Sequence, residues 1–176
     1  EQALKPVSVM IYSEYIDPAM LDDFERKTGY KIHLELYEAQ EEMIGKLLSM
    51  GPSQYDVIIA SDVVIQQMLR LGLITAIDAE KVPNRKNIAV QFFNRPYDPT
   101  NTYTIPYLWG TTGILYRDKS IDPDSVSYSM LFNSSKTKGN FSFLNESRSM
   151  LALALLAIGF DANSTSQTEI NKAVEH

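Results

Sequence analysis

The sequence predicts an α/β fold in which helices cover both faces of a parallel sheet. Between residues 7 and 72, apolar runs typical of strands alternate three times with amphipathic helical patterns. A glycine follows each helical pattern, as is common at helix ends. The third apolar run, YDVIIA at residues 55–60, is continuous, which is typical of a strand covered on both faces.

The first strand and helix are predicted within residues 7–29, VSVMIYSEYIDPAMLDDFERKTG. Residues 7–12 are mostly apolar and favour a buried strand. Asp17 followed by Pro18 predicts a helix start, because Asp caps free N–H groups and proline is tolerated at the first helical position. Gly29 predicts the end of this helix.

Two further strand and helix pairs are predicted after Gly29. Residues 32–36 alternate between apolar and polar side chains, which indicates a strand with one exposed face. An apolar helical stripe follows and ends at Gly51. After the YDVIIA strand, Ser61 and Asp62 can cap a third helix, which Gly72 ends.

The remainder of the chain predicts a second region. Residues 103–116, YTIPYLWGTTGILY, are expected to form an extended passage that leaves the first region. A strand followed by a helix is predicted within residues 139–160, with Asn145 at the helix cap. A final helix is predicted with Ser164 or Thr165 as its cap, and the chain stops directly after it, so we expect a fragment.

Composition excludes several classes of function. The chain has 176 residues, of which 44% are hydrophobic and 22% charged, as expected of a soluble globular protein. A formal net charge of −6 argues against nucleic-acid binding, which depends on Lys and Arg. Cysteine is absent, which excludes disulfides and thiolate metal sites. The two histidines have no metal-ligand spacing, and we expect no metal and no cofactor.

Targeting and enzyme signals are also lacking. No apolar run reaches the roughly 18 residues of a membrane span. No charged leader opens the chain, so we expect either a cytosolic protein or one whose signal peptide has been removed. The nucleophile-elbow, P-loop and dinucleotide motifs are absent. Ser61, Asp62 and His33 could form a triad on paper, but their spacing does not support one.

Polar and aromatic side chains follow two of the predicted strands. In open parallel sheets, ligands bind beyond the carboxyl ends of the strands. Tyr12 ends the first strand, Ser13, Glu14 and Tyr15 follow it directly, and Ser61 follows the third strand. We therefore expect these residues to line a ligand site, because carboxylates and aromatic faces both attract cations.

Three segments identify a resemblance: YSEYIDPAMLDDFERKTG, YEAQEEMIGKLLSMGPSQYDVIIAS and RPYDPTNTYTIPYLWGTTGILY. From about Val9 to its end, the chain resembles the spermidine/putrescine-binding proteins of bacterial ABC polyamine importers. The resemblance implies a periplasmic-binding-protein-like fold of class II, with two α/β lobes around a cleft. Residues 1–111 would form lobe one, nearly complete, and residues 112–176 the incomplete start of lobe two. The chain would then be an N-terminal fragment.

The resemblance also implies roles for the residues of the first lobe. Tyr12 stands where the family usually has a tryptophan that packs on ligand methylenes, and Ser13 stands where a threonine makes a polar contact. Glu14 matches the carboxylate that pairs with a ligand ammonium. Tyr15 matches a tyrosine wall, and Ser61 matches a polar contact at the third strand.

In the second lobe the resemblance is less exact. Glu146 falls where the family commonly has an aspartate that faces an ammonium group. Ser149 falls where spermidine binders have a glutamate, and in lobe one Val63 replaces a tyrosine. These departures leave the identity of the polyamine open.

The function that follows from the resemblance is capture and delivery of a solute, without catalysis. We expect a monomeric periplasmic protein that captures a putrescine- or spermidine-class polyamine between its lobes and delivers it to ABC permease subunits at the membrane. Lipid anchoring before processing is left open. The alternatives are a binder of another small solute, such as an amino-acid derivative or a metal-bearing anion, a sensor, and an α/β hydrolase or transferase.

Overall fold

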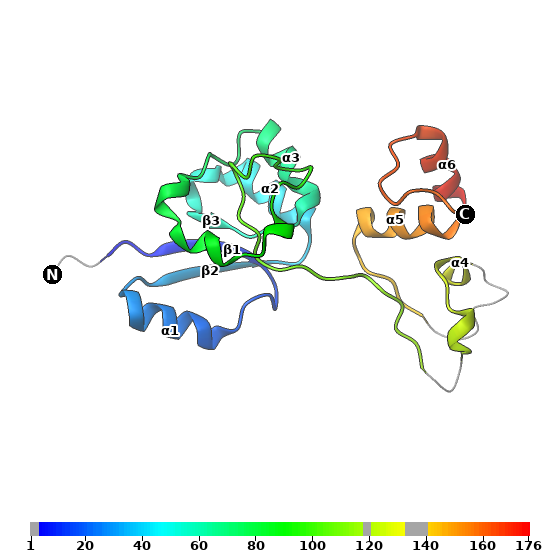
Figure 1. Ribbon diagram of the computed structural model, residues 1–176, viewed down its shortest axis with the longest axis horizontal. Coiled ribbons are helices and arrows are strands. Elements are labelled where there is room, and N and C mark those ends of the chain that lie inside the picture. The colour runs from blue at the N-terminus through cyan, green and yellow to red at the C-terminus, as the bar shows by residue number, and fades with distance from the viewer. Residues whose placement is uncertain (1–3, 118–120, 133–140) are drawn as a thin grey trace. The chain divides into compact units, whose positions relative to one another are not determined.

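The chain forms two compact units, Glu1–Trp109 and Gly110–His176. The computed structural model describes residues 4–117, 121–132 and 141–176 (Figure 1). The N-terminal unit holds the three strands that alternate with helices, and the regular elements described in the C-terminal unit are all helices.

A three-stranded parallel sheet organises the N-terminal unit. Its strands are β1 (Val7–Tyr12), β2 (Ile32–Tyr37) and β3 (Val57–Ile58), in the order β2-β1-β3. The register places Tyr12 beside Tyr37, so β1 and β2 end at the same level. The prediction of a parallel α/β sheet is confirmed.

The three helices of this unit are α1 (Pro18–Thr28), α2 (Gln40–Met50) and α3 (Asp62–Arg70). The chain steps from β1 to β2 in one direction and from β2 past β1 to β3 in the other. Right-handed crossovers therefore place α1 and α2 on opposite faces of the sheet. Figure 1 shows α1 on one side of the strands and α2 with α3 on the other.

The ends of α1 confirm the predicted caps. The Asp17 carboxylate accepts a hydrogen bond from the Ala19 N–H at 2.9 Å, and Pro18 occupies the first helical position. Gly29 has a φ of 76°, and its N–H donates to the Glu25 carbonyl at 2.8 Å. A side chain would be strained at this φ, so the glycine is needed to end the helix there.

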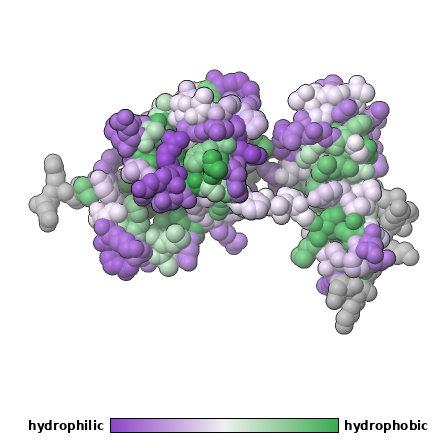
Figure 2. Space-filling view, viewed as in Figure 1, coloured by the Kyte–Doolittle hydropathy of each residue, from purple (hydrophilic) through white to green (hydrophobic). Residues whose placement is uncertain are grey.

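The core of the N-terminal unit lies on the α2 and α3 face of the sheet. It is built from buried side chains of β1, β2, α2, α3 and the segment after α3: Met10, Tyr37, Met43, Ile44, Leu47, Val64, Ile65, Met68 and Leu73. The α1 face is less well covered. All of α1 is described and none of its residues is buried, and Phe24 is 43% exposed. Figure 2 shows apolar residues at the surface of this unit among hydrophilic ones.

The third strand differs from the prediction. The expected strand over residues 55–60 is only Val57–Ile58, and Val57 is 45% exposed. The prediction that this strand is covered on both faces is therefore wrong for the described residues. The reason is its position at the edge of the sheet, with only β1 beside it.

The C-terminal unit contains α4 (Tyr128–Leu131), α5 (Ser147–Ala157) and α6 (Gln167–Glu175). Its small core consists of Ala154, Leu155 and Ala173, with partly buried aromatic and aliphatic side chains around them. None of the helices within the described ranges is long and apolar enough to cross a membrane.

Several predicted details of the C-terminal unit are corrected. The strand expected before α5 lies partly outside the described residues, and residues 141–144 form no strand. Glu146, and not Asn145, is the N-cap of α5. Ser166, and not Ser164 or Thr165, is the N-cap of α6. Helix caps are short-range signals, and neighbouring polar residues compete for them.

Candidate functional site

The turn after β1 brings four of the predicted residues together at one edge of the sheet. The Ser13 N–H donates to the Tyr37 carbonyl at 3.1 Å, which extends the β1–β2 pairing by one residue. The Tyr15 N–H then donates to the Tyr12 carbonyl at 3.3 Å and closes a turn. Both β1 and β2 end here, so the turn lies at the carboxyl edge where parallel sheets bind ligands.

Glu14 occupies a strained position in this turn. Its φ is +64°, in the left-handed region that non-glycine residues seldom adopt, and its side chain is exposed. Such a conformation costs on the order of 1–3 kcal/mol and is concentrated at functional sites. This strained position carries an exposed carboxylate, and in the sequence it lies between Tyr12 and Tyr15.

Three tyrosine rings pack against one another at the same edge of the sheet. The Tyr12 and Tyr15 ring centroids lie 5.1 Å apart, and Tyr12 meets Tyr37 edge to face at 5.4 Å. Tyr37 is almost fully buried, and its hydroxyl donates to the Ile59 carbonyl at 2.9 Å. Tyr37 therefore supports Tyr12 from behind, while Tyr15 is 47% exposed. Sequence reasoning missed Tyr37, although equal lengths of β1 and β2 would have placed it beside Tyr12.

Tyr107 is a second residue that sequence reasoning missed. Its hydroxyl donates to the Tyr15 carbonyl at 2.7 Å, across 92 positions of sequence. This bond ties the strained turn to the segment before residue 110. The available signal was the third segment of the resemblance, which contains Tyr107 within IPYLWGTTG.

The loop before Tyr107 is held by a buried carboxylate. Asp98 accepts hydrogen bonds from the N–H groups of Thr102, Tyr103 and Thr104 at 2.9–3.1 Å and from the Thr104 hydroxyl at 2.9 Å. Burial by itself would raise the pKa of the Asp98 carboxyl, but these hydrogen bonds lower it below its usual value. Asp98 is therefore ionised, and its carboxylate holds the loop in place through these hydrogen bonds.

The two predicted serines of this unit each donate to a neighbouring carboxylate. The Ser13 hydroxyl lies 2.6 Å from the Glu38 Oε1, and the Ser61 hydroxyl lies 3.3 Å from the Asp62 Oδ1. Ser61 is at the N-cap of α3, but its side chain makes no capping hydrogen bond. Ser61 therefore lies at the predicted cap position, but its hydroxyl bonds to the Asp62 carboxylate and not to a backbone group of the helix. Glu38 was not predicted, although it follows the last residue of β2.

The two predicted residues of the C-terminal unit also pair with each other. Glu146 and Ser149 are half-buried at the start of α5, and the Ser149 hydroxyl donates to the Glu146 Oε2. The first turn of a helix favours a carboxylate at this position. The seven predicted residues thus form one group in each unit, apart from Ser61, which follows β3.

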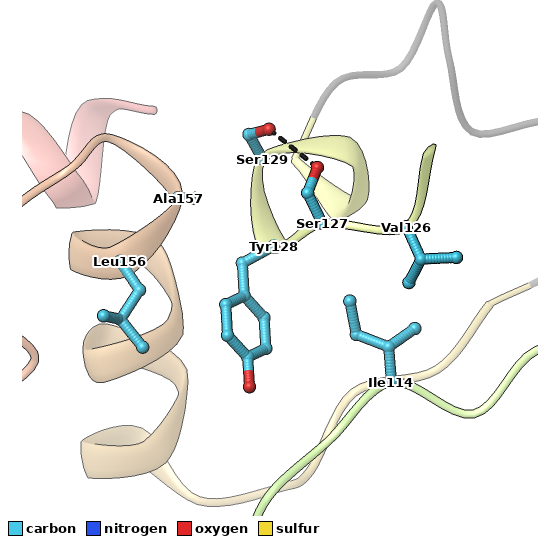
Figure 3. Close-up of a pocket in the computed structure, with 7 residues that line it drawn as sticks. All are labelled: Ile114, Val126, Ser127, Tyr128, Ser129, Leu156 and Ala157. Atoms are coloured by element: carbon cyan, nitrogen blue, oxygen red, sulfur yellow. Dashed lines mark hydrogen bonds between the residues drawn. The ribbon is translucent and has the colours of Figure 1, made fainter. Parts of the chain in front are cut away.

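A cavity of about 480 Å³ lies within the C-terminal unit, away from all predicted residues. Figure 3 shows its lining, in which Tyr128 stands near Ile114 and Leu156. The Tyr128 hydroxyl donates to the Thr112 carbonyl at 3.1 Å, and Ser127 and Ser129 pair with each other. The lining has no carboxylate, so the cavity offers no countercharge to a cation. No metal-binding group of His, Asp and Glu occurs among the residues that the structure describes.

Comparison with known proteins identifies a family. The family described as bacterial extracellular solute-binding protein matches residues 19–175. The spermidine/putrescine-binding periplasmic protein of Escherichia coli is 33% identical over 162 residues, which cover 92% of this chain and 47% of that protein. The chain therefore spans about half the length of this relative.

Two solved structures share the fold. The spermidine/putrescine ABC transporter substrate-binding protein PotD of Streptococcus pneumoniae has a TM-score of 0.74 and 28% identity, over 98% of this chain and 53% of that one. The TpPotD lipoprotein of Treponema pallidum has a TM-score of 0.84 and 26% identity, over 96% of this chain and 53% of that one. The Streptococcus pneumoniae protein is named as the substrate-binding protein of an ABC transporter, in agreement with the solute-binding family that matches this chain.

Proposed function

Because this chain belongs to the bacterial extracellular solute-binding proteins, we propose that it takes part in capturing a polyamine of the putrescine or spermidine class. The names of its relatives support this ligand class. The observation that supports it most is Glu14, whose exposed carboxylate sits at a strained φ in the same turn as the packed rings of Tyr12 and Tyr15.

The chemistry of the turn suits an alkyl ammonium ligand. A polyamine is a chain of methylenes with cations along it. The Tyr12 and Tyr15 rings can pack against the methylenes and attract an ammonium, an interaction worth about 0.5–2 kcal/mol. The Glu14 carboxylate can accept charge-assisted hydrogen bonds from that ammonium, which are roughly twice as strong as neutral ones.

The second unit supplies another carboxylate in this proposal. Glu146 would accept from a different ammonium of the same ligand, with Ser149 beside it. Binding to both units would stabilise a closed arrangement through the ligand's differential affinity for it. Ser61 would add a polar contact from the end of β3.

The partners and location follow from the same proposal. The protein would act outside the cytoplasm, in the periplasm or as a lipid-anchored form, as a monomer that passes its solute to ABC permease subunits. The periplasmic protein of Escherichia coli supports the periplasmic location, and the Treponema pallidum lipoprotein supports the lipid-anchored form.

Calorimetric titration of the natural full-length protein with putrescine, spermidine and spermine tests the proposal. We expect binding of at least one of them with a Kd in the micromolar range or below, which corresponds to about −8 kcal/mol or better. No heat with any of the three would contradict the polyamine assignment. Hydrolysis of a generic ester that is lost in Ser61→Ala would instead support the hydrolase alternative.

A further inference from the structure

We infer that the serines of the proposed site are fixed as hydrogen-bond acceptors by neighbouring carboxylates, and that this selects cationic solutes over zwitterionic and anionic ones. The inference rests on the proposed function and names the residues that set its specificity. It assigns positioning roles to Glu38 and Asp62, which act through Ser13 and Ser61.

The geometry repeats at all three predicted serines. Ser13 donates to Glu38 at 2.6 Å, Ser61 donates to Asp62 at 3.3 Å, and Ser149 donates to Glu146. The three pairs lie after β1, after β3 and at the start of α5. The same pairing thus recurs in separate elements of the fold.

A serine hydroxyl has one proton and two lone pairs. The second group near the Ser13 hydroxyl is the Tyr37 carbonyl at 3.5 Å, which is also an acceptor. The proton therefore points to one of these two acceptors, and the lone pairs remain for a ligand. A ligand N–H can donate to such an oxygen, whereas a ligand carboxylate cannot accept from it.

The chain segments that carry the proposed groups of the N-terminal unit contain no basic side chain. Residues 12–15, 37–40 and 59–62 contain no Lys or Arg. In the C-terminal unit Arg148 lies between Glu146 and Ser149 in sequence, but its guanidinium donates to the Asn163 side chain at 3.2 Å. A ligand carboxylate at these groups would lose its hydration without a countercharge, which is costly. The amino-acid derivative and metal-bearing anion alternatives are therefore disfavoured.

The test uses two ligands of similar length. Putrescine has an ammonium at each end, whereas 4-aminobutyrate has a carboxylate in place of one of them. The natural full-length protein is titrated with both in a calorimeter. We expect putrescine to bind more tightly by on the order of 100-fold or more, because the carboxylate would face only acceptors.

The Glu38→Gln variant tests the positioning role. An amide can turn its NH₂ group to Ser13 and free the serine proton to face the ligand. We expect putrescine binding to weaken by about 3- to 10-fold, while 4-aminobutyrate binding does not weaken, so that the selectivity ratio falls. Asp62→Asn tests the second pair in the same way. Asp22→Asn is the matched control, because it removes one exposed charge from α1 and should leave the ratio unchanged.

A double substitution separates positioning from long-range charge. In the Ser13→Ala background, Glu38→Gln should change the Kd for putrescine no more than Asp22→Asn does. An unchanged selectivity ratio in both Glu38→Gln and Asp62→Asn, or an undiminished effect without Ser13, would overturn the inference and leave the proposed function standing. Failure of the wild-type protein to bind any polyamine would overturn the proposed function itself.

Discussion

At the scale of the single residue, Glu14 is the most informative position. Its side chain is exposed and buries no surface that would stabilise the fold, and its φ of +64° is unfavourable for any residue with a Cβ atom. An exposed side chain at such an unfavourable backbone angle indicates that the residue serves a function other than stability. The strain and the carboxylate can be separated by substitution.

Comparison of Glu14→Gly with Glu14→Ala measures this strain. Both remove the carboxylate, but only glycine relieves the left-handed backbone. We predict that Glu14→Gly is more stable than Glu14→Ala by about 1 kcal/mol, because the Cβ penalty exceeds the entropic cost of glycine. Urea unfolding at pH 7 gives the two free energies. At an ordinary loop position the order is reversed, and that result would show that φ at residue 14 is not left-handed.

Site residues within one continuous segment could be predicted from the sequence. Residues that are distant in the sequence and come into contact only in the folded chain could not. Tyr12 to Tyr15 were predicted as site residues because they follow a clear strand. Tyr107 meets Tyr15 only after the chain has returned across 92 positions, and no local pattern encodes that contact. Glu38 lies beside Ser13 only because β1 and β2 end at the same level.

At the scale of the element, the loop that contains Asp98 connects stability to the site. The buried carboxylate satisfies three backbone N–H groups and one hydroxyl. The loop also holds Asn94 and Asn101 at positive φ, and their side-chain amides pair with each other at 2.6 Å. Asparagine tolerates this backbone better than most residues, so the loop is ordered by its own side chains.

Asp98→Asn should destabilise the protein in a manner that depends on pH. The folded pKa of Asp98 lies below its ordinary value of 3.8, so its stabilising contribution is present above that value and is lost as pH falls through the folded pKa. We predict a loss of about 1–3 kcal/mol at pH 7, since an amide NH₂ would face N–H donors. The difference from wild type should shrink as the pH is lowered toward the folded pKa.

Chemical denaturation across this pH range checks the prediction, with Asp22→Asn as an exposed control that should change little. A difference that grows on acidification would show that Asp98 is not held as a carboxylate.

The elements themselves were predicted with uneven success, for physical reasons. The ends of α1 were exact because Asp17, Pro18 and Gly29 act through local backbone chemistry. The third strand was overestimated, because the run YDVIIA records hydrophobicity and cannot record that β3 lies at a sheet edge. The α5 cap was misplaced by one residue within the polar pair Asn145 and Glu146.

At the scale of the whole molecule, the proposed binding function needs groups from both units. Each unit contains a serine and carboxylate pair, and the family consists of solute-binding proteins. The chain spans about half the length of the relatives it matches. The division of the proposed site between Glu1–Trp109 and Gly110–His176 therefore stays a prediction, as does the placement of the lobe boundary near residue 111.

The central claim is that the carboxylate of Glu14 neutralises an ammonium of a bound polyamine. The most direct measurement is the Kd for putrescine of the natural full-length protein, wild type against Glu14→Gln, by calorimetry at pH 7. The substitution keeps the size of the side chain and removes its charge. We predict binding weaker by at least about tenfold, because a desolvated ammonium would lose its countercharge. An equal Kd for both proteins would contradict the account.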